Sequence, residues 1–185
     1  MGILAMFRRR PHERAGFELY GVAVGAARNP ALFAGLGVPD TLEGRFDLVS
    51  LHVGLLIRRL RTDGDARGPA LAQAVFDAMF ADMDVNLREM GVGDMSVGKR
   101  VRGMWEAFHG RALAYEAALD SADPATLAEA LARNVWRGAP PPDDAAGRLA
   151  QLARAQAAHL AGQGIDGLAA GRVAFLPAEG LIHAA

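Results

Sequence analysis

The sequence predicts an all-α protein, a single-domain multi-helix bundle of about six helices with a glycine-rich C-terminal tail. Three observations carry this prediction. Apolar residues recur at three- and four-residue spacing through most of the chain. No strand pattern alternates with these segments, and no repeat of roughly 20–50 residues is visible. A chain of 185 residues also has the length of one domain that can bury a core unaided.

The first predicted helix covers residues 13–27. Its apolar face consists of Phe17, Tyr20 and Val24. Asn29 and Pro30 then predict a short capped helical turn. In the next segment, Asp40 and Glu43 have the spacing of a capping box before a helix. The apolar stripe of that helix is so wide that we expect burial on most sides. It consists of Phe46, Leu48, Val49, Leu51, Val53, Leu55, Leu56 and Leu60.

The loop TDGDARG, residues 62–68, separates this helix from a third one that we expect to begin at Pro69. The apolar face of the third helix consists of Phe76, Met79, Phe80, Met83, Leu87 and Met90. Gly91 and Gly93 end it, because glycine supplies the left-handed cap that terminates many helices. Ser96 is expected to cap a fourth helix. The stripe of the fourth helix consists of Val97, Val101, Met104, Trp105, Phe108, Tyr115 and Leu119.

Asp123 and Pro124 predict the start of a fifth helix. The turn GAPPPDD separates it from a sixth helix over residues 145–161. RVAFL in the remaining tail is a candidate short strand. We therefore divide the chain into an N-terminal segment, a helical domain and a tail. These cover residues 1–13, 14–161 and 162–185.

Composition excludes several functional classes. The chain has no cysteine, which removes disulfides and thiolate sites, and its formal net charge of −1 argues against DNA as a partner. No window approaches the roughly 18 apolar residues of a membrane span. Arg8, Arg9 and Arg10 follow a short apolar run. A frayed N-terminus explains such a segment, and contact with an anionic membrane surface is the alternative. We expect a cytoplasmic protein, with peripheral binding at the inner face of the cytoplasmic membrane as an open alternative.

The stretch GVGDMSVGKR, residues 91–100, contains most of a P-loop pattern. A functional P-loop follows a buried strand and ends in Ser or Thr, whose hydroxyl binds magnesium. Here Arg100 occupies that last position, and an amphipathic helix is predicted before the glycines. The sequence therefore does not predict nucleotide hydrolysis.

Metal and catalytic patterns also fail. Asp82, Asp84 and Asn86 resemble the opening of a calcium loop, but Leu87 stands where glycine must turn the chain. None of the histidines has the spacing of a zinc motif. Haem ligation by His52 or His109 stays open. The sequence thus predicts no catalytic residue, no metal site and no cofactor, and we expect a non-enzymatic protein.

In the segment from residue 82 to 119, charged residues are dense on helices that are also apolar. Three sequence segments resemble the ubiquinol-cytochrome c chaperone family: DMDVNLREMGVGDMSVGKRV, GMWEAFHGRALAYEAAL and, further on, ALARNVW. The members of that family are assembly factors for cytochrome b of respiratory complex III. LYGVAVGAARNPALFAGLGVPDTLEGRFDLVSLHVGLLIRRL is similar to the family's opening helices. The resemblance covers about residues 14–137, and the tail after Pro140 lies outside it.

The resemblance implies an assembly chaperone that binds newly made cytochrome b. The composition is more similar to bacterial members than to mitochondrial ones, for which a small partner protein and the ribosome are implied. Those two roles stay open here. The resemblance nominates a polar contact set for the partner: Asp82, Asn86, Arg88, Glu89, Asp94, Lys99, Arg100 and Arg111. A solvated face with salt bridges explains the same charges.

A second hypothesis comes from a different functional class. A helical bundle of this kind could bind a small apolar or haem-like ligand. The expected pocket is lined by Phe46, Met79, Trp105 and Phe108. The methionines of the third and fourth helices offer adaptable contact area to a client, although they serve equally well to fill a core.

Overall fold

The structure, a computed structural model, describes residues 12–182, and every regular element within this range is a helix. This confirms the predicted all-α class. In chain order the helices are α1 (Glu13–Ala27), α2 (Pro30–Ala34), α3 (Leu42–Arg61), α4 (Arg67–Glu89), α5 (Asp94–Asp120), α6 (Ala125–Val135), α7 (Ala145–Ala161), α8 (Ile165–Ala169) and α9 (Ala178–Ile182). The basic residues Arg8, Arg9 and Arg10 lie outside the described range.

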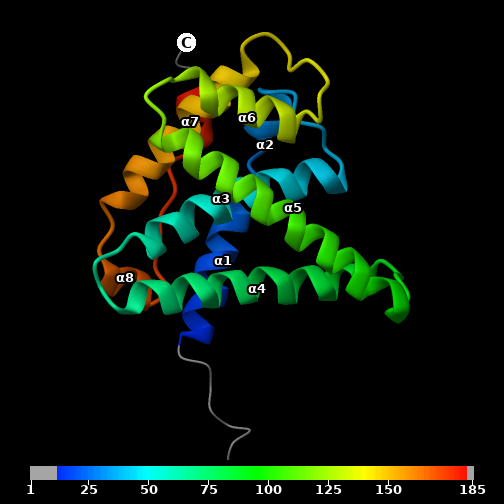
Figure 1. Cartoon of the computed structure of the whole chain (residues 1–185), viewed down its shortest axis with the longest axis vertical. Helices are drawn as coiled ribbons and strands as arrows, with labels where there is room; N and C mark the ends of the chain where they lie inside the picture. The colour runs from blue at the N-terminus through cyan, green and yellow to red at the C-terminus, as the bar shows by residue number, and fades with distance from the viewer. Residues whose placement is uncertain (1–11, 183–185) are drawn as a thin grey trace, which may run out of the picture.

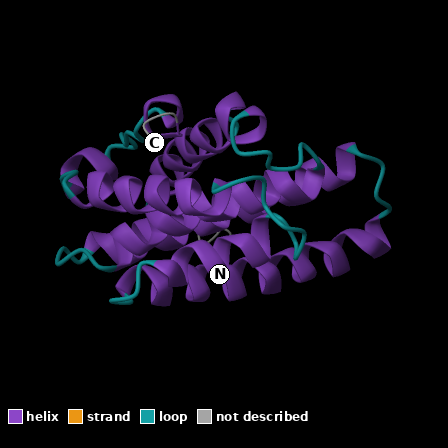
Figure 2. Cartoon of the chain, turned by 90° about the horizontal axis from the view of Figure 1, so that it is seen from above, coloured by secondary structure: helices purple, strands orange, loops and turns teal. Residues whose placement is uncertain are grey.

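Helix α3 is the centre of the bundle and packs against α1, α4, α5, α6 and α7. Its apolar stripe is buried on nearly all sides, as its width predicts, and Leu48, Leu56 and Leu60 are fully buried. Helices α4 and α5 leave a common turn and diverge across the front of α1 and α3 (Figure 1). Seen from above, the described chain consists of packed helices joined by loops (Figure 2). A single core therefore serves the whole bundle.

The helix starts differ from the sequence prediction at several points. Thr41, rather than Asp40, caps α3, because its hydroxyl oxygen accepts a hydrogen bond from the Gly44 N–H at 3.1 Å. Asp40 instead pairs with Arg45 at 2.6 Å. Helix α4 begins at Arg67, before Pro69. The expected cap at Ser96 is also wrong.

Helix α5 begins at Asp94 directly after Gly93, so Ser96 lies within its first turn. Before it, Gly91 has a φ of 79°, the left-handed conformation expected at the end of α4. The turn between the two long helices is consequently very short. The two helices diverge directly after this turn, and their divergence leaves an open surface between them (Figure 1).

The tail packs along the bundle. Helices α8 and α9 lie within it, joined by an extended segment at residues 172–177 that is not a strand, so the strand expected at RVAFL is wrong. The hydrogen bonds of this segment go to side chains. Gln163 pairs with both backbone groups of Ala174 at 2.7 and 2.9 Å. Gln156 does the same with Leu176, at 2.8 Å in each bond.

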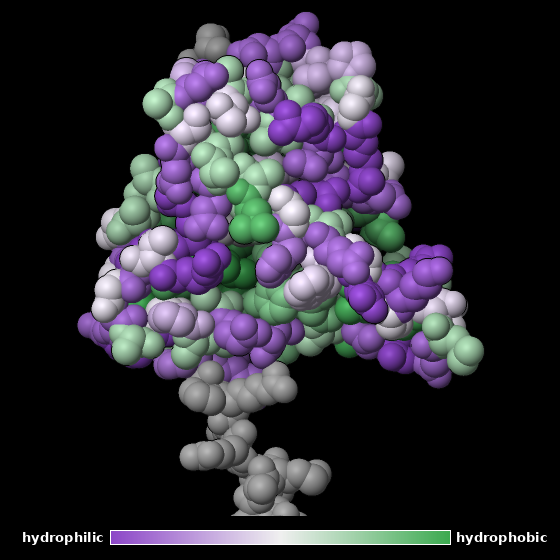
Figure 3. Space-filling view, viewed as in Figure 1, coloured by the Kyte–Doolittle hydropathy of each residue, from purple (hydrophilic) through white to green (hydrophobic). Residues whose placement is uncertain are grey.

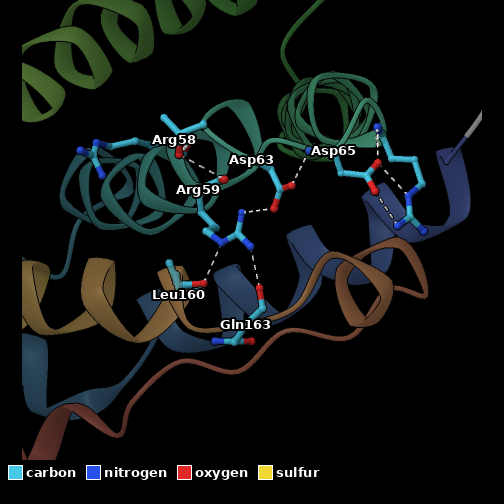
Figure 4. Close-up of polar contacts among 8 residues, drawn as sticks. Arg58, Arg59, Asp63, Asp65, Leu160 and Gln163 are labelled. Carbon is cyan, nitrogen blue, oxygen red and sulfur yellow. Dashed lines mark hydrogen bonds and ion pairs between the residues drawn. The ribbon is translucent and has the colours of Figure 1, made fainter.

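A guanidinium joins the end of α3 to the end of α7 (Figure 4). Arg59 donates to the carbonyl oxygens of Leu160 at 3.0 Å and Gln163 at 2.7 Å. The same side chain pairs with Asp63 at 2.5 Å. In the adjoining loop, Asp65 accepts from Arg67, which lowers the pKa of Asp65 to about 2. These contacts fix the α3–α4 loop against the start of the tail.

Candidate functional site

The space between α4 and α5 forms an open cavity of about 630 Å³, here called the wedge cavity. It is closed at the back by the end of α3. The lining residues are Ile57, Arg61, Pro69, Ala72, Gln73, Phe76, Trp105, Phe108, His109, Ala112, Leu113 and Glu116. Hydrophobic side chains gather in the hollow between the two helices, with hydrophilic ones along its edges (Figure 3).

The exposed apolar side chains of the wedge cavity indicate what kind of ligand it can bind. Trp105 is 42% exposed and stacks on His109, with ring centroids 4.7 Å apart. Leu113 on the same helix is 59% exposed. Arg61 and Glu116 form an ion pair of 3.6 Å at the cavity. An apolar groove with a few polar groups is the form of surface that receives an amphipathic helix.

A second cavity of about 290 Å³ lies on the other side of α5 and is called here the arginine cavity. Helical periodicity separates the two, because the α5 residues that line them fall on opposite sides of the helix. The lining consists of Leu42, Glu43, Phe46, Leu87, Arg100, Gly103, Met104, Ala107, Arg111 and Arg137.

A buried carboxylate holds two arginines of the arginine cavity. Asp47 of α3 is completely buried and pairs with Arg111 at 2.8 Å and with Arg137 at 3.1 Å. Burial raises the pKa of Asp47 to about 6, although both guanidinium groups act in the opposite direction. The guanidinium of Arg111 also lies over the Phe46 ring, 5.7 Å from its centroid. Arg137 has a φ of 53°, a left-handed conformation uncommon for a side chain of this kind.

The predicted polar contact set does not form one surface. Asp82 accepts a hydrogen bond of 2.7 Å from the Tyr20 hydroxyl; burial and this carboxylate together raise the pKa of Tyr20. Asn86 donates to the backbone oxygen of Asp82 at 2.8 Å. Arg88 joins both helices of the hairpin, because it pairs with Asp84 of α4 at 2.6 Å and with Asp94 of α5.

The remaining members of the set are better placed to meet a partner. Glu89 and Lys99 are exposed near the turn of the α4–α5 hairpin. Arg100 and Arg111 both line the arginine cavity. The structure thus brings two of the predicted residues together in a cavity and uses four others for contacts within the fold: Asp82, Asn86, Arg88 and Asp94.

The prediction of one small-ligand pocket lined by Phe46, Met79, Trp105 and Phe108 is wrong. Trp105 and Phe108 line the wedge cavity, whereas Phe46 lines the arginine cavity. Met79 is fully buried in the core. All four belong to apolar helix faces, but Phe46 lies against one side of α5 and Trp105 projects from the opposite side. The four residues therefore line no common pocket.

The remaining motifs have structural roles. Helix α4, not a strand, precedes the glycine-rich stretch. His52 is buried, its Nδ1 lies 2.8 Å from the Leu48 oxygen, and burial lowers its pKa. Within residues 12–182, no group of three or more His, Asp or Glu side chains is arranged to hold a metal ion. No helix in the same range is both long and apolar enough to cross a membrane.

Several residues of these cavities were not singled out in the sequence. The sequence could have identified Asp47, because a carboxylate within an apolar stripe needs a partner when it is buried. Arg137 had no such signal, since its position depends on a backbone conformation after α6. Leu113 had only a weak one, because an exposed leucine by itself is ordinary.

The family model described as Ubiquinol-cytochrome C chaperone matches residues 34–175. This chain belongs to that family. The match runs past Pro140, where the resemblance noted in the sequence ended. Helices α7 and α8 and the first part of the glutamine-bound segment, up to residue 175, therefore also lie in the matched region. The family is one of complex III assembly factors, and its all-helical fold is the one described above.

Two relatives agree with this assignment. The crystal structure of the Cbp3 homolog from Brucella abortus superposes with a TM-score of 0.80 at 36% identity, covering 96% of this chain and 98% of that one. The ubiquinol-cytochrome-c reductase complex assembly factor 1 of Xenopus laevis is 27% identical over 121 residues, which are 65% of this chain. This chain spans 60% of the length of that curated relative.

Proposed function

We propose that this chaperone holds an apolar helical segment of newly made cytochrome b in the wedge cavity while ubiquinol-cytochrome c reductase is assembled. The observation that carries the proposal is the open cavity of about 630 Å³, with a half-exposed Trp105 and an exposed Leu113 on its wall. Cytochrome b as the client comes from the family resemblance.

The chemistry of the cavity suits such a client. A membrane helix outside the bilayer exposes apolar side chains, and burying them against Ile57, Phe76 and Leu113 removes both surfaces from water. The free protein already leaves this surface open between two long helices, so binding requires no unfolding of the core. The role is non-enzymatic, because shielding needs shape and apolar area rather than a reacting group.

The polar contact set has a secondary part in this proposal. Glu89 and Lys99 lie near the hairpin turn, at the end of the wedge, where they can meet polar residues that flank an apolar client segment. The cellular site that fits this role is the inner face of the cytoplasmic membrane, with Arg8, Arg9 and Arg10 as the cations that would contact anionic lipid.

A capture experiment tests the proposal. Tagged protein is recovered from detergent-solubilised membranes of the native host, and co-purified cytochrome b is measured by immunoblot. Leu113→Glu places a charge on the wall of the wedge and should abolish capture. Val22→Glu is the matched control, because Val22 is also exposed but lies on α1. Both variants must keep the helical circular dichroism of the wild type.

Two results would contradict the proposal in different ways. If cytochrome b is absent from the wild-type eluate, the client assignment is wrong. If Leu113→Glu captures as much as the wild type, cytochrome b binds elsewhere. A Soret absorbance in the purified protein would instead support the haem-like ligand of the second hypothesis, with His109 in the wedge cavity as the first histidine to replace.

A further inference from the structure

The arginine cavity is lined by more cationic than anionic side chains. Three guanidinium groups line it, those of Arg100, Arg111 and Arg137, against one carboxylate, Glu43. Asp47 lies beneath and is shared by Arg111 and Arg137. Arg100 forms no hydrogen bond or ion pair with any residue between 12 and 182. One cation at the mouth of the cavity is thus unmatched.

The buried donors of the cavity are also incompletely used. The Nε atom of Arg111 is buried and has no hydrogen-bond partner within the described residues. A buried N–H without an acceptor costs stability, so its retention calls for a reason. Arg137 is held in a left-handed backbone conformation, and such strain concentrates where a side chain must be aimed. Both observations concern the same pair of arginines above Asp47.

The walls of the cavity are apolar beside this cationic centre. Phe46 and Leu87 are 8% and 3% exposed, so they form a recessed floor, while Leu42 at the edge is half exposed. A volume of about 290 Å³ is at the lower limit for a small-molecule site. It therefore suits a group the size of one or two side chains better than a complete lipid chain.

From these contacts we propose that the arginine cavity is a docking site for an acidic peptide segment of a partner protein, in which a Glu or Asp carboxylate reaches the guanidinium groups and an adjacent apolar side chain covers Phe46 and Leu87. Arginine donors match a carboxylate in a paired geometry. A bilayer surface fits less well, because it engages protruding apolar side chains, and this floor is recessed.

The site is separate from the wedge cavity, because α5 lies between them. A helix held against Trp105 and Leu113 leaves the arginine cavity open. The inference therefore adds a second interaction surface to the proposed function and does not depend on the identity of the client in the wedge.

The test uses the full chain labelled with ¹⁵N and two capped peptides, acetyl-Leu-Leu-Glu-Leu-amide and the same peptide with Gln in place of Glu. Amide chemical shifts are followed during titration with each peptide. We expect the Glu peptide to shift amides of residues 42–47 and 100–111 and to bind about two- to fivefold more tightly than the Gln peptide, the range expected of one exposed ion pair. Added salt should reduce the difference.

Arg100→Gln should remove the preference for the Glu peptide. Arg102→Gln is the matched control, because Arg102 lies on the same helix, pairs with Glu106 and does not line the cavity. Equal binding of the two peptides, shifts confined to the wedge cavity, or an equal effect of both substitutions would each overturn the proposal. So would Arg100-dependent sedimentation with phosphatidylglycerol vesicles in the absence of peptide binding, which would assign the cavity to a membrane.

Discussion

Asp47 is a carboxylate in the middle of the most buried helix of the protein. Two opposing effects act on it. Burial favours the neutral acid, and the ion pairs with Arg111 and Arg137 favour the charged form. Burial is the larger effect and raises the pKa from 3.8 to about 6. A buried ion pair of this kind gives little net stability, but removal of one partner leaves a charge uncompensated.

The stability of the protein should report this balance. Because the native pKa is raised, the native state binds the Asp47 proton more tightly than the unfolded state between pH 3.8 and about 6. The contribution of Asp47 to the unfolding free energy is therefore fully present below that window and is lost as pH rises through it. The free energy of unfolding of the wild type minus that of Asp47→Asn should fall by about 2–3 kcal/mol from pH 4 to pH 7.

Denaturant unfolding at a series of pH values measures this difference. Asp47→Asn should be about as stable as the wild type at pH 4, where Asp47 is also neutral, and more stable than the wild type at pH 7, where burial penalises the ionised Asp47. Titration of the Asp47 carboxyl carbon by NMR gives the pKa directly. A midpoint below 4, or a free-energy difference that grows with pH, would show that the arginines outweigh burial.

At the scale of the element, the crossing of α1 and α4 depends on one glycine. A Cβ atom on Gly16 would lie 2.6 Å from the carbonyl carbon of Ala74, closer than any real contact. The two helix backbones can approach this closely only because that atom is missing. Gly21 in the same helix has no atom within 4 Å of such a position.

These two glycines should respond oppositely to alanine. Gly16→Ala should lower the free energy of unfolding by about 1–3 kcal/mol, because α1 must move away from α4. Gly21→Ala should raise it by about 0.5–1 kcal/mol, since alanine restricts the unfolded chain in an exposed helical position. Urea unfolding of both variants decides the matter. A neutral or stabilising Gly16→Ala would mean that the crossing can relax without loss.

The charged residues of the α4–α5 hairpin include Arg88, which forms ion pairs within the fold, and Lys99, which is exposed. Arg88 pairs with Asp84 and Asp94, so Arg88→Glu would gather three carboxylates at the turn. We expect this variant to lose about 1 kcal/mol or more of stability and to loosen the wedge. Lys99→Glu, at an exposed position of α5, should leave stability within about 0.5 kcal/mol of the wild type.

Comparison of the two variants in the cytochrome b capture assay separates folding from contact. If Lys99 touches the client, capture falls in Lys99→Glu at unchanged thermal stability. If capture falls only in Arg88→Glu, the hairpin geometry matters and the charge of Lys99 does not. Unchanged capture in both variants would remove these two residues from the contact set.

At the scale of the whole molecule, the tail is bound to the bundle through side chains. Gln156 is buried, and its amide satisfies both the N–H and the C=O of Leu176. Gln156→Ala should cost about 1–3 kcal/mol of unfolding free energy, because two backbone groups lose their partners. Gln151→Ala on the exposed side of the same helix is the matched control and should be nearly neutral.

Hydrogen exchange at the Leu176 amide gives the local readout. Exchange should accelerate in Gln156→Ala and stay slow in Gln151→Ala. Equal exchange in the two variants would mean that the Gln156 bonds do not hold the tail, and that contacts such as Gln163 with Ala174 and Phe175 with His52 are sufficient.

Local signals in the sequence predicted most of the helices and little of the sites. Helix α7 is found at residues 145–161, as predicted, because a proline-rich turn precedes it and its apolar period is regular. The strand prediction at RVAFL failed, since the partners of that segment are two glutamine side chains, Gln156 of α7 and Gln163 in the turn after it. The ligand pocket failed for a related reason. The helical period shows that Phe46 and Trp105 are apolar-face residues. It does not show that Phe46 will pack on the side of α5 opposite to Trp105.

The binding of the tail across the bundle has a consequence for biosynthesis. Phe175 packs on His52 with ring centroids 5.6 Å apart, and Arg59 awaits the carbonyl groups of Leu160 and Gln163. Central residues of α3 thus gain some of their contacts only when residues about 100 or more positions later in the chain have been made. Contacts so distant along the chain slow folding. A ribosome that has released only α1 to α6 therefore displays a chaperone whose own core is still open, and which must itself avoid aggregation until α7 and the segment after it emerge.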